Sequence, residues 1–101
     1  MIDIQPQHLA IVQQILQTYL PTYEVRAFGS RVKGTATTFS DLDLVVMSEQ
    51  PLDLRTLCQV EMAFSESDLP YTVDIVDWAT TSQKFQEIIG KKCVVIQTKR
   101  S

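Results

Sequence analysis

Four prolines set the main limits on how this chain of 101 residues can fold. They are Pro6, Pro21, Pro51 and Pro70. A proline is tolerated in the first turn of a helix, but its ring and its missing N–H stop a helix or a central strand. Helices and strands must therefore begin or end near these positions. The chain is long enough for one domain, which we expect to span residues 1–101.

The residues between the prolines alternate between helical and extended patterns. Apolar residues spaced three and four apart are typical of helices, and short runs rich in β-branched residues are typical of strands. The fold class predicted is α/β (α+β), a small mixed β-sheet with helices packed mainly on one face. The predicted helices are 6–20, 51 to before 70, and 81 or 82 to 90, with a helical turn over 32–34; the predicted strands are 23–28, 41–47 and 71–76, with 93–96 as a short last strand.

Composition narrows the class of protein further. Hydrophobic residues make up 45% of the chain and charged residues 21%, which excludes a disordered chain or a fibre. No apolar run approaches the roughly 18 residues of a membrane span and the start lacks a signal-peptide pattern, so we expect a cytoplasmic protein without a membrane partner. A net charge of −3 argues against direct nucleic-acid binding. The apolar residues interpreted as core are Cys58, Cys93, Trp78, Phe85, Ile88 and Ile89.

Asp41 and Asp43 lie two residues apart in the predicted strand 41–47. Side chains two apart on a strand point to the same face, so both carboxylates share one face while Leu42 and Leu44 pack on the other. Adjacent carboxylates repel each other unless a cation neutralises them, and Mg²⁺ prefers such oxygen ligands. Asp-x-Asp is also common on solvent-facing strands, so the pair alone leaves a metal site and an acidic surface both open.

Asp74 favours the metal site, because it interrupts the otherwise apolar strand 71–76. That strand can pair beside the strand of Asp41 and bring a third carboxylate to the same place. Asp77 is the competing third acid, but at the end of its strand it is explained as an exposed acid or a helix cap. We therefore expect Asp41, Asp43 and Asp74 to converge.

Gly29 and Ser30 follow the predicted strand 23–28 and supply features that suit a phosphate. A glycine lets the backbone approach a phosphate closely, and the serine hydroxyl and the N–H groups of the next turn can donate hydrogen bonds to it. Arg31 and Lys33 add positive charge in the same short stretch. The turn is therefore predicted to hold one end of a triphosphate while metal ions bridge its oxygens to the aspartates.

The spacing of these residues resembles a known pattern. Gly29-Ser30, ten further residues and Asp41-x-Asp43 resemble the signature of the DNA polymerase β-type nucleotidyltransferase superfamily. The longer stretch from Phe28, Phe-Gly-Ser-Arg-Val-Lys-Gly, five residues, then Ser-Asp-Leu-Asp-Leu, is similar to its minimal nucleotidyltransferase branch. That branch often has Arg where this chain has Lys33, which keeps the charge but loses the planar fork of donors.

The resemblance implies a fold, a cofactor and roles for these residues. It implies the polymerase β-type nucleotidyltransferase core, ATP as substrate and two Mg²⁺ ions. In the family, the positions of Gly29 and Ser30 bind the β- and γ-phosphates, and those of Asp41 and Asp43 hold the metal ions. The position of Asp74 holds the third carboxylate, which binds metal and helps to deprotonate the acceptor hydroxyl.

The resemblance also implies a partner. Proteins of the minimal branch pair, as antitoxins, with a HEPN-domain ribonuclease toxin, and transfer AMP from ATP to a tyrosine hydroxyl of that toxin. A chain of this length has room for the transfer core but for little else, so we expect the acceptor to be held by a hetero-oligomeric partner. Two alternatives stay open: a non-catalytic antitoxin that covers the toxin surface, and a stand-alone transferase that modifies a small hydroxylated molecule.

Overall fold

The computed structural model describes residues 2–99 of the chain. Helices and strands alternate along it, as the pattern of apolar residues predicts. In chain order the elements are α1 (Pro6–Tyr19), β1 (Val25–Phe28), α2 (Ser30–Lys33), β2 (Leu42–Val46), α3 (Leu54–Ser65), β3 (Val73–Asp77), the 3₁₀ turn η1 (Trp78–Thr80), α4 (Gln83–Lys91) and β4 (Val94–Gln97).

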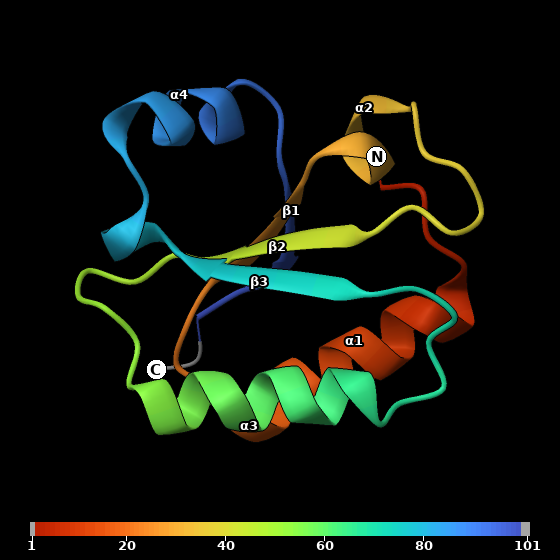
Figure 1. Cartoon of the computed structure of the whole chain (residues 1–101), viewed down its shortest axis with the longest axis horizontal. Coiled ribbons are helices and arrows are strands. Elements are labelled where there is room, and N and C mark those ends of the chain that lie inside the picture. The colour runs from red at the N-terminus through yellow and green to blue at the C-terminus, as the bar shows by residue number, and fades with distance from the viewer. Residues whose placement is uncertain (1, 100–101) are drawn as a thin grey trace.

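The four strands of these residues form one mixed sheet in the order β3-β2-β1-β4. Strand β1 pairs antiparallel with both β2 and β4, and β2 pairs parallel with β3. Parallel neighbours need a crossover connection, and α3 provides it by running back beneath the sheet between β2 and β3 (Figure 1). The predicted mixed sheet is confirmed.

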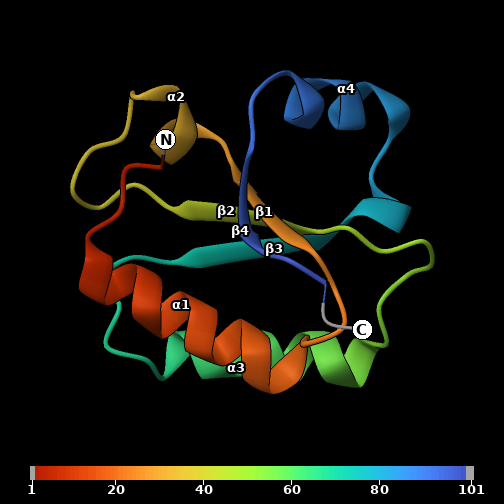
Figure 2. The ribbon, with the colours of Figure 1, turned by 180° about the vertical axis from the view of Figure 1, so that it is seen from behind.

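The two long helices cover one face of the sheet. In both views, α1 and α3 lie side by side below it, while the short α2 and α4 lie on the opposite side (Figures 1 and 2). No helix within residues 2–99 is long and apolar enough to cross a membrane. The α2 and α4 side leaves the starts of β2 and β3 accessible, and the predicted acidic residues lie there.

Alternation along β2 separates the core from the site. Leu42, Leu44 and Val46 are fully buried and belong to the same core as residues of α1 and α3. Asp43 lies between them in sequence and therefore points to the other face of the sheet. The burial of three large apolar side chains thus decides which face carries the carboxylate.

The structure corrects several expected core residues. Cys58 is exposed, so its interpretation as a core residue is wrong, whereas Cys93 is half-buried. Helix α3 begins at Leu54 and turns Val60 and Phe64 inward, which leaves Leu54 73% exposed on the outer side. Residues four apart share a helix face, so Cys58 lies on the same outer side as Leu54.

Helix α4 also differs from the expectation. It continues through Gly90 to Lys91, so the glycine does not end it. Ile89 is buried and Phe85 is half-buried, as expected for core residues, but Ile88 is exposed. Consecutive helical residues point about 100° apart, so Ile88 and Ile89 cannot both face the sheet.

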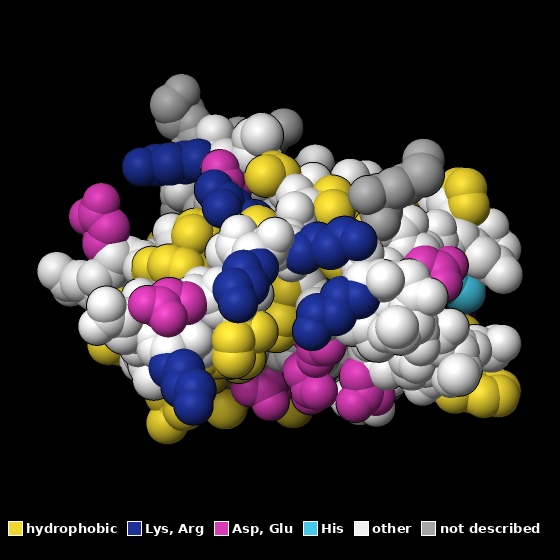
Figure 3. Space-filling model, turned by 90° about the horizontal axis from the view of Figure 1, so that it is seen from above, with side chains coloured by type: hydrophobic (Ala, Val, Ile, Leu, Met, Phe, Trp, Pro, Cys, Tyr) yellow, Lys and Arg dark blue, Asp and Glu magenta, His cyan; other side chains and the backbone are white. Residues whose placement is uncertain are grey.

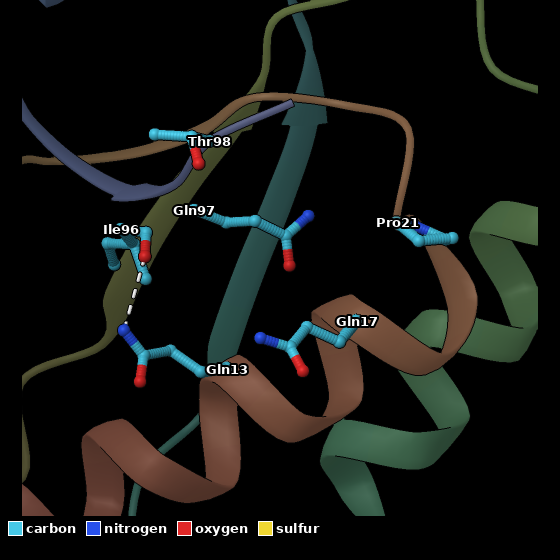
Figure 4. A pocket seen from close by; sticks show the side chains of 6 residues that line it. All are labelled: Gln13, Gln17, Pro21, Ile96, Gln97 and Thr98. Carbon is cyan, nitrogen blue, oxygen red and sulfur yellow. Dashed lines mark hydrogen bonds between the residues drawn. The ribbon is translucent and has the colours of Figure 1, made fainter. Parts of the chain in front are cut away.

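A small polar cavity lies between the end of α1 and β4, on the side of the sheet away from β3. It encloses about 210 Å³ and is lined by Gln13, Gln17 and Gln97 among others (Figure 4). The Gln97 amide donates to the carbonyl oxygens of Leu20 and Tyr23, at 2.8 and 3.0 Å. The Gln13 amide donates to the Ile96 carbonyl at 3.2 Å, so Gln13 and Gln97 fasten the last strand to α1 and to the segment that follows it, away from the acidic site.

The contrast between Leu44 and Leu54 tests this core. Leu44→Ala removes a fully buried side chain from the centre of the sheet and should lower the free energy of unfolding by about 2–5 kcal/mol. Leu54→Ala makes the same chemical change at an exposed position and should stay within about 0.5 kcal/mol. Urea denaturation followed by circular dichroism measures both, and equal losses would contradict the assigned core.

Candidate active site

Asp43 and Asp74 lie directly opposite each other in the parallel pair of β2 and β3. Residues paired in this way point to the same face of a sheet, so the two carboxylates project together from the α2 and α4 side. Asp43 is half-buried, whereas Asp74 is exposed. The structure thus brings together two of the three predicted acids, from strands about thirty residues apart in the sequence.

Asp41 precedes β2 by one residue and is exposed. The residue after it is already paired with the neighbouring chain segment, because the Leu42 N–H donates to the Thr72 carbonyl at 2.9 Å. Alternation along the strand places Asp41 on the same face as Asp43. The third acid therefore lies at the edge of the pair formed by Asp43 and Asp74.

Burial raises the pKa of the Asp43 carboxyl above its usual value, and the negative charges of Asp74 and Asp41 raise it further. The three carboxylates are thus close enough to repel one another. A proton or a cation at this position would relieve that repulsion. The site consequently has a ready affinity for positive charge.

The donor set fits Mg²⁺ only when other ligands take part. Within residues 2–99, no three His, Cys, Asp or Glu side chains are close enough together to hold a metal ion by themselves. Mg²⁺ is usually bound by one or two carboxylates, with phosphate oxygens and water completing the shell. Asp41 and Asp43, with Asp74 beside them, are suited to that mode of binding.

Gly29 lies against the Asp43 carboxylate. Its backbone has φ 82° and ψ −157°, a region that is essentially restricted to glycine. A Cβ at this position would overlap the Asp43 carboxylate. The turn from β1 into α2 therefore approaches the acids as closely as the backbone allows, and Ser30 follows at the first position of α2.

The two predicted cations of this stretch are placed differently. Lys33 is exposed, whereas Arg31 is buried and its guanidinium donates to the main-chain carbonyls of Asp3, Thr38 and Ser40. A side chain held in this way does not reach out to a phosphate. The structure therefore gives Arg31 a place different from the predicted one, and the sequence could not show it because the acceptors are main-chain atoms.

Asp77, the competing third acid, is buried and takes no part in the acidic cluster. Its carboxylate accepts hydrogen bonds from the Leu52 N–H, at 2.8 Å, and from the Thr80 hydroxyl. Burial raises the pKa of Asp77, but the hydrogen bonds from Thr80 and Leu52 outweigh that effect and leave the pKa below its ordinary value. The interpretation of Asp77 as an exposed acid is wrong. Asp77 does lie at the N-cap position of η1, as the alternative expected, but its side chain makes no cap hydrogen bond there and instead fastens the segment before α3 to the end of β3.

An open cavity of about 500 Å³ adjoins the acids. Asp43 and Asp74 contribute to its lining together with Phe28 and Phe85, whose rings meet edge to face with 5.7 Å between their centroids. Neither phenylalanine was predicted as a site residue: Phe85 was interpreted as core, and Phe28 entered only as the first residue of the family motif. Phe28 could have been found from pairing alone, because it lies opposite Asp43 in the antiparallel ladder.

Several cations lie on the same side of the molecule. Seen from above, Lys and Arg side chains cross the face that carries α2 and α4, with a group of acidic side chains along its lower edge and other acids towards the left and right (Figure 3). Lys33 of α2, Lys84 and Lys91 of α4, and the following Lys92 are all exposed. A molecule bound over the acids would therefore meet cations around them.

The comparisons with known proteins agree with this geometry. The sequence profile described as polymerase beta, nucleotidyltransferase, matches residues 11–101. The chain belongs to the polymerase beta nucleotidyltransferase family. It is also 58% identical, over 98 residues, to the probable protein adenylyltransferase MntA of Haemophilus influenzae, an alignment that covers 97% of this chain and 86% of that protein.

Solved structures share the fold of this nucleotidyltransferase. A toxin–antitoxin complex crystallised with AMP-PNP contains a chain that superposes with a TM-score of 0.74 at 23% identity, covering 89% of this chain and 73% of that one. A complex of a tri-AMPylated HEPN toxin with an MNT antitoxin, from Shewanella oneidensis, gives 0.69 at 20% identity, with 94% and 74% covered. The resemblance to the polymerase β-type fold is thereby confirmed.

Substitutions at two glycines test the contact between Gly29 and Asp43. Gly29→Ala should lower the free energy of unfolding by about 3 kcal/mol or more, from backbone strain together with overlap with the carboxylate. Gly34→Ala also has a positive φ, 82°, but a Cβ there meets no atom within 4 Å, so about 1 kcal/mol is expected. Chemical denaturation gives both values. Adding Asp43→Ala should recover part of the lost free energy of unfolding in Gly29→Ala, but none of it in Gly34→Ala.

The raised pKa of Asp43 predicts a pH-dependent stability. An acid whose pKa is higher in the folded state than in the unfolded state favours folding only while it is protonated, so this contribution is lost as the pH rises through the folded-state value. Without metal, Asp43→Asn should therefore raise the melting temperature at pH 7 by a few degrees and leave it almost unchanged at about pH 3. Thermal unfolding in EDTA at the two pH values measures the effect. A stabilisation that is equal at both would refute the electrostatic cause.

Proposed function

We propose that this nucleotidyltransferase transfers AMP from ATP, in a Mg²⁺-dependent reaction, to a hydroxyl group of a HEPN ribonuclease toxin, most simply a tyrosine hydroxyl, and so acts as its antitoxin. The observation that carries the proposal is the meeting of Asp43 and Asp74 across β2 and β3, against a glycine turn with no room for a side chain. The 58% identity to a probable protein adenylyltransferase supports the same reaction.

The proposed reaction is an in-line displacement at the α-phosphorus of ATP. The acceptor oxygen forms a bond to this phosphorus, the bond from phosphorus to the bridging oxygen breaks, and pyrophosphate leaves. The hydroxyl proton passes to the exposed carboxylate of Asp74, which has no competing ion pair among residues 2–99. Bound Mg²⁺, held by Asp41 and Asp43, would neutralise charge on the phosphates and lower the proton affinity of the acceptor.

The rest of the chain binds and orients the nucleotide. We assign the β- and γ-phosphates to the main chain at Gly29 and the hydroxyl of Ser30, with Lys33 as an exposed cation of the same short helix; the close approach of Gly29 to Asp43 supports this assignment. The cavity beside Phe28 and Phe85, at about 500 Å³, has the size and the apolar walls that a nucleoside needs. We assign it to the base and ribose of ATP.

The partner and setting follow from the same proposal. Solved relatives of this fold are a toxin–antitoxin complex with AMP-PNP and a complex of an MNT antitoxin with an AMPylated HEPN toxin. We therefore propose a hetero-oligomer with such a toxin, formed in the cytoplasm where ATP is available. The whole chain, residues 1–101, would act in it as one minimal nucleotidyltransferase domain.

Label transfer from ATP tests the reaction. Incubation with Mg²⁺, α-labelled ATP and the co-encoded HEPN protein should label that protein, and Asp41→Asn or Asp43→Asn should reduce the rate by at least about 10³-fold, because phosphates then lose their charge stabilisation. Asp68→Asn, at an exposed turn, makes the same chemical change away from the site and should be neutral.

Two other outcomes identify the alternatives. If no label reaches the HEPN protein and the aspartate variants still protect cells against it, the protein is a non-catalytic antitoxin. If label reaches a small hydroxylated molecule in the absence of any protein partner, it is a stand-alone transferase. The first outcome would be accompanied by stable complex formation, which co-purification detects.

A further inference from the structure

Arg31 is buried, at 6% exposure, although it belongs to a four-residue helix near the surface. Its Nε donates to the Ser40 carbonyl at 2.9 Å, and its two terminal nitrogens donate to the carbonyls of Asp3 and Thr38 at 3.0 Å each. The guanidinium plane also lies over the Tyr71 ring, with its carbon 3.9 Å from the ring centroid. Arg31 thus binds three main-chain carbonyls on two separate stretches, the N-terminal segment at Asp3 and the turn at Thr38 and Ser40, and packs against Tyr71 on a third.

The positive charge of Arg31 is not used in an ion pair within the described part of the chain. Among residues 2–99, no carboxylate lies within 4.0 Å of the guanidinium. Burying a cation is unfavourable unless hydrogen bonds replace its water, and here main-chain carbonyls and an aromatic face do so. The fork of donors suits several carbonyls at once, which a lysine ammonium could not match.

The carbonyl that accepts from Nε belongs to the peptide unit leading into Asp41. A peptide unit is planar, so fixing the Ser40 carbonyl also fixes the orientation of the Asp41 nitrogen. The next peptide unit is held as well, because the Leu42 N–H donates to the Thr72 carbonyl at 2.9 Å. Both peptide planes that flank Asp41 are therefore fixed, although its carboxylate is exposed.

The turn of residues 37–40, before Asp41, is attached to the rest of the molecule through Arg31. Thr37 and Ser40 close the turn internally: the Thr37 N–H donates to the Ser40 hydroxyl at 2.8 Å, and the Ser40 N–H donates to the Thr37 carbonyl at 3.2 Å. These bonds shape the turn but do not attach it to the sheet. Arg31 attaches it to α2, and a reciprocal bond from the Asp3 N–H to the Arg31 carbonyl, at 2.6 Å, adds the N-terminal segment.

We propose that Arg31 is a positioning residue, which fixes the Asp41 carboxylate beside Asp43 through the Ser40–Asp41 peptide and does not touch the nucleotide. The inference rests on the proposed function only in that Asp41 is taken as a ligand of metal-bound ATP. Arg31 then sets the affinity for the metal ion rather than the chemistry of the transfer step. Partners that orient metal ligands typically change metal affinity by about 10- to 100-fold when they are removed.

Hydrogen exchange tests the anchor without any activity. In Arg31→Lys and Arg31→Gln, the amides of residues 38–42 should exchange about tenfold faster or more, while those of α1 and α3 keep their rates. Arg55→Gln, which removes an exposed cation from α3, should match the native protein throughout. If Arg31→Gln does not fold, Tyr71→Leu removes the aromatic support and leaves all three carbonyl acceptors in place. Native exchange rates at 38–42 in a folded Arg31→Lys would overturn the proposal.

Mn²⁺ binding tests the consequence for the metal. Electron paramagnetic resonance can titrate Mn²⁺ into the protein with an ATP analogue that carries a methylene group between the α- and β-phosphorus. The Mn²⁺ dissociation constant should rise about tenfold or more in Arg31→Lys and stay native in Arg55→Gln. In label transfer, the metal concentration for half-maximal rate should rise similarly, while the rate at saturating metal changes less. A purely structural role would instead lower the active fraction and leave the metal constant native.

The outcomes separate this proposal from the proposed function. If the native protein binds Mn²⁺ with the analogue but transfers no AMP, the transfer function fails, and Arg31 is still judged by exchange and Mn²⁺ affinity. If the native protein transfers AMP and Arg31→Lys binds Mn²⁺ as tightly, the positioning role is refuted and the function stands. Absence of Mn²⁺ binding by the native protein with the analogue would overturn both.

Discussion

The parallel pairing of β2 with β3 is the constraint on which the site depends. It sets Asp43 opposite Asp74, an arrangement that two negative charges oppose. In general, two unit charges about 4 Å apart repel each other by on the order of 1 kcal/mol in water and 4 kcal/mol near a protein surface. Burial of each leucine of β2, Leu42 and Leu44, contributes roughly 1.5–3 kcal/mol in the other direction. The core therefore holds the register, and the register holds the carboxylates together.

The same register explains why the site is specific in its geometry. A slip of one residue between β2 and β3 would send Leu44 to the exposed face and Asp43 into the core, so no intermediate register is available. Gly29 then completes the arrangement from β1, because its unusual backbone brings the turn against Asp43 without a side chain in the way. Repulsion between the acids is thus an outcome of packing, and it leaves the site prepared for a cation.

Sequence periodicity was sufficient to predict the features of the site that depend on the alternation of side chains along a strand. Asp43 and Asp74 interrupt apolar strands, so their common face could be predicted once the strands were paired, and Gly29 marked the close turn. Helix phase was less accessible: one residue more or less at the start of α3 decides whether Cys58 faces the core or solvent. The apolar pattern of 54–64 fits more than one phase, and packing against α1 and β3 accompanies the observed one.

Main-chain partners explain the remaining differences. Arg31 was predicted to bind phosphate and Asp77 to be an exposed acid or a helix cap, yet both side chains are buried and bonded to backbone groups of other segments. Every residue carries a carbonyl and almost every one an N–H, so no sequence pattern marks such a partner. Only the three-dimensional path of the chain reveals that Ser40 and Leu52 supply them.

The buried charges of Arg31 and Asp77 have a different role from the exposed charges of Asp41 and Asp74. Arg31 fixes the segment that enters β2, and Asp77 fixes the end of β3 to the segment that enters α3. Hydrogen bonds to a charged group are worth about 1.5–3 kcal/mol each, enough to immobilise a loop that has little apolar surface to bury. Asp41 and Asp74 can therefore remain exposed while the backbone beneath them stays fixed. Their exposure leaves both carboxylates accessible from solvent, and the buried charges of Arg31 and Asp77 hold the backbone that carries them.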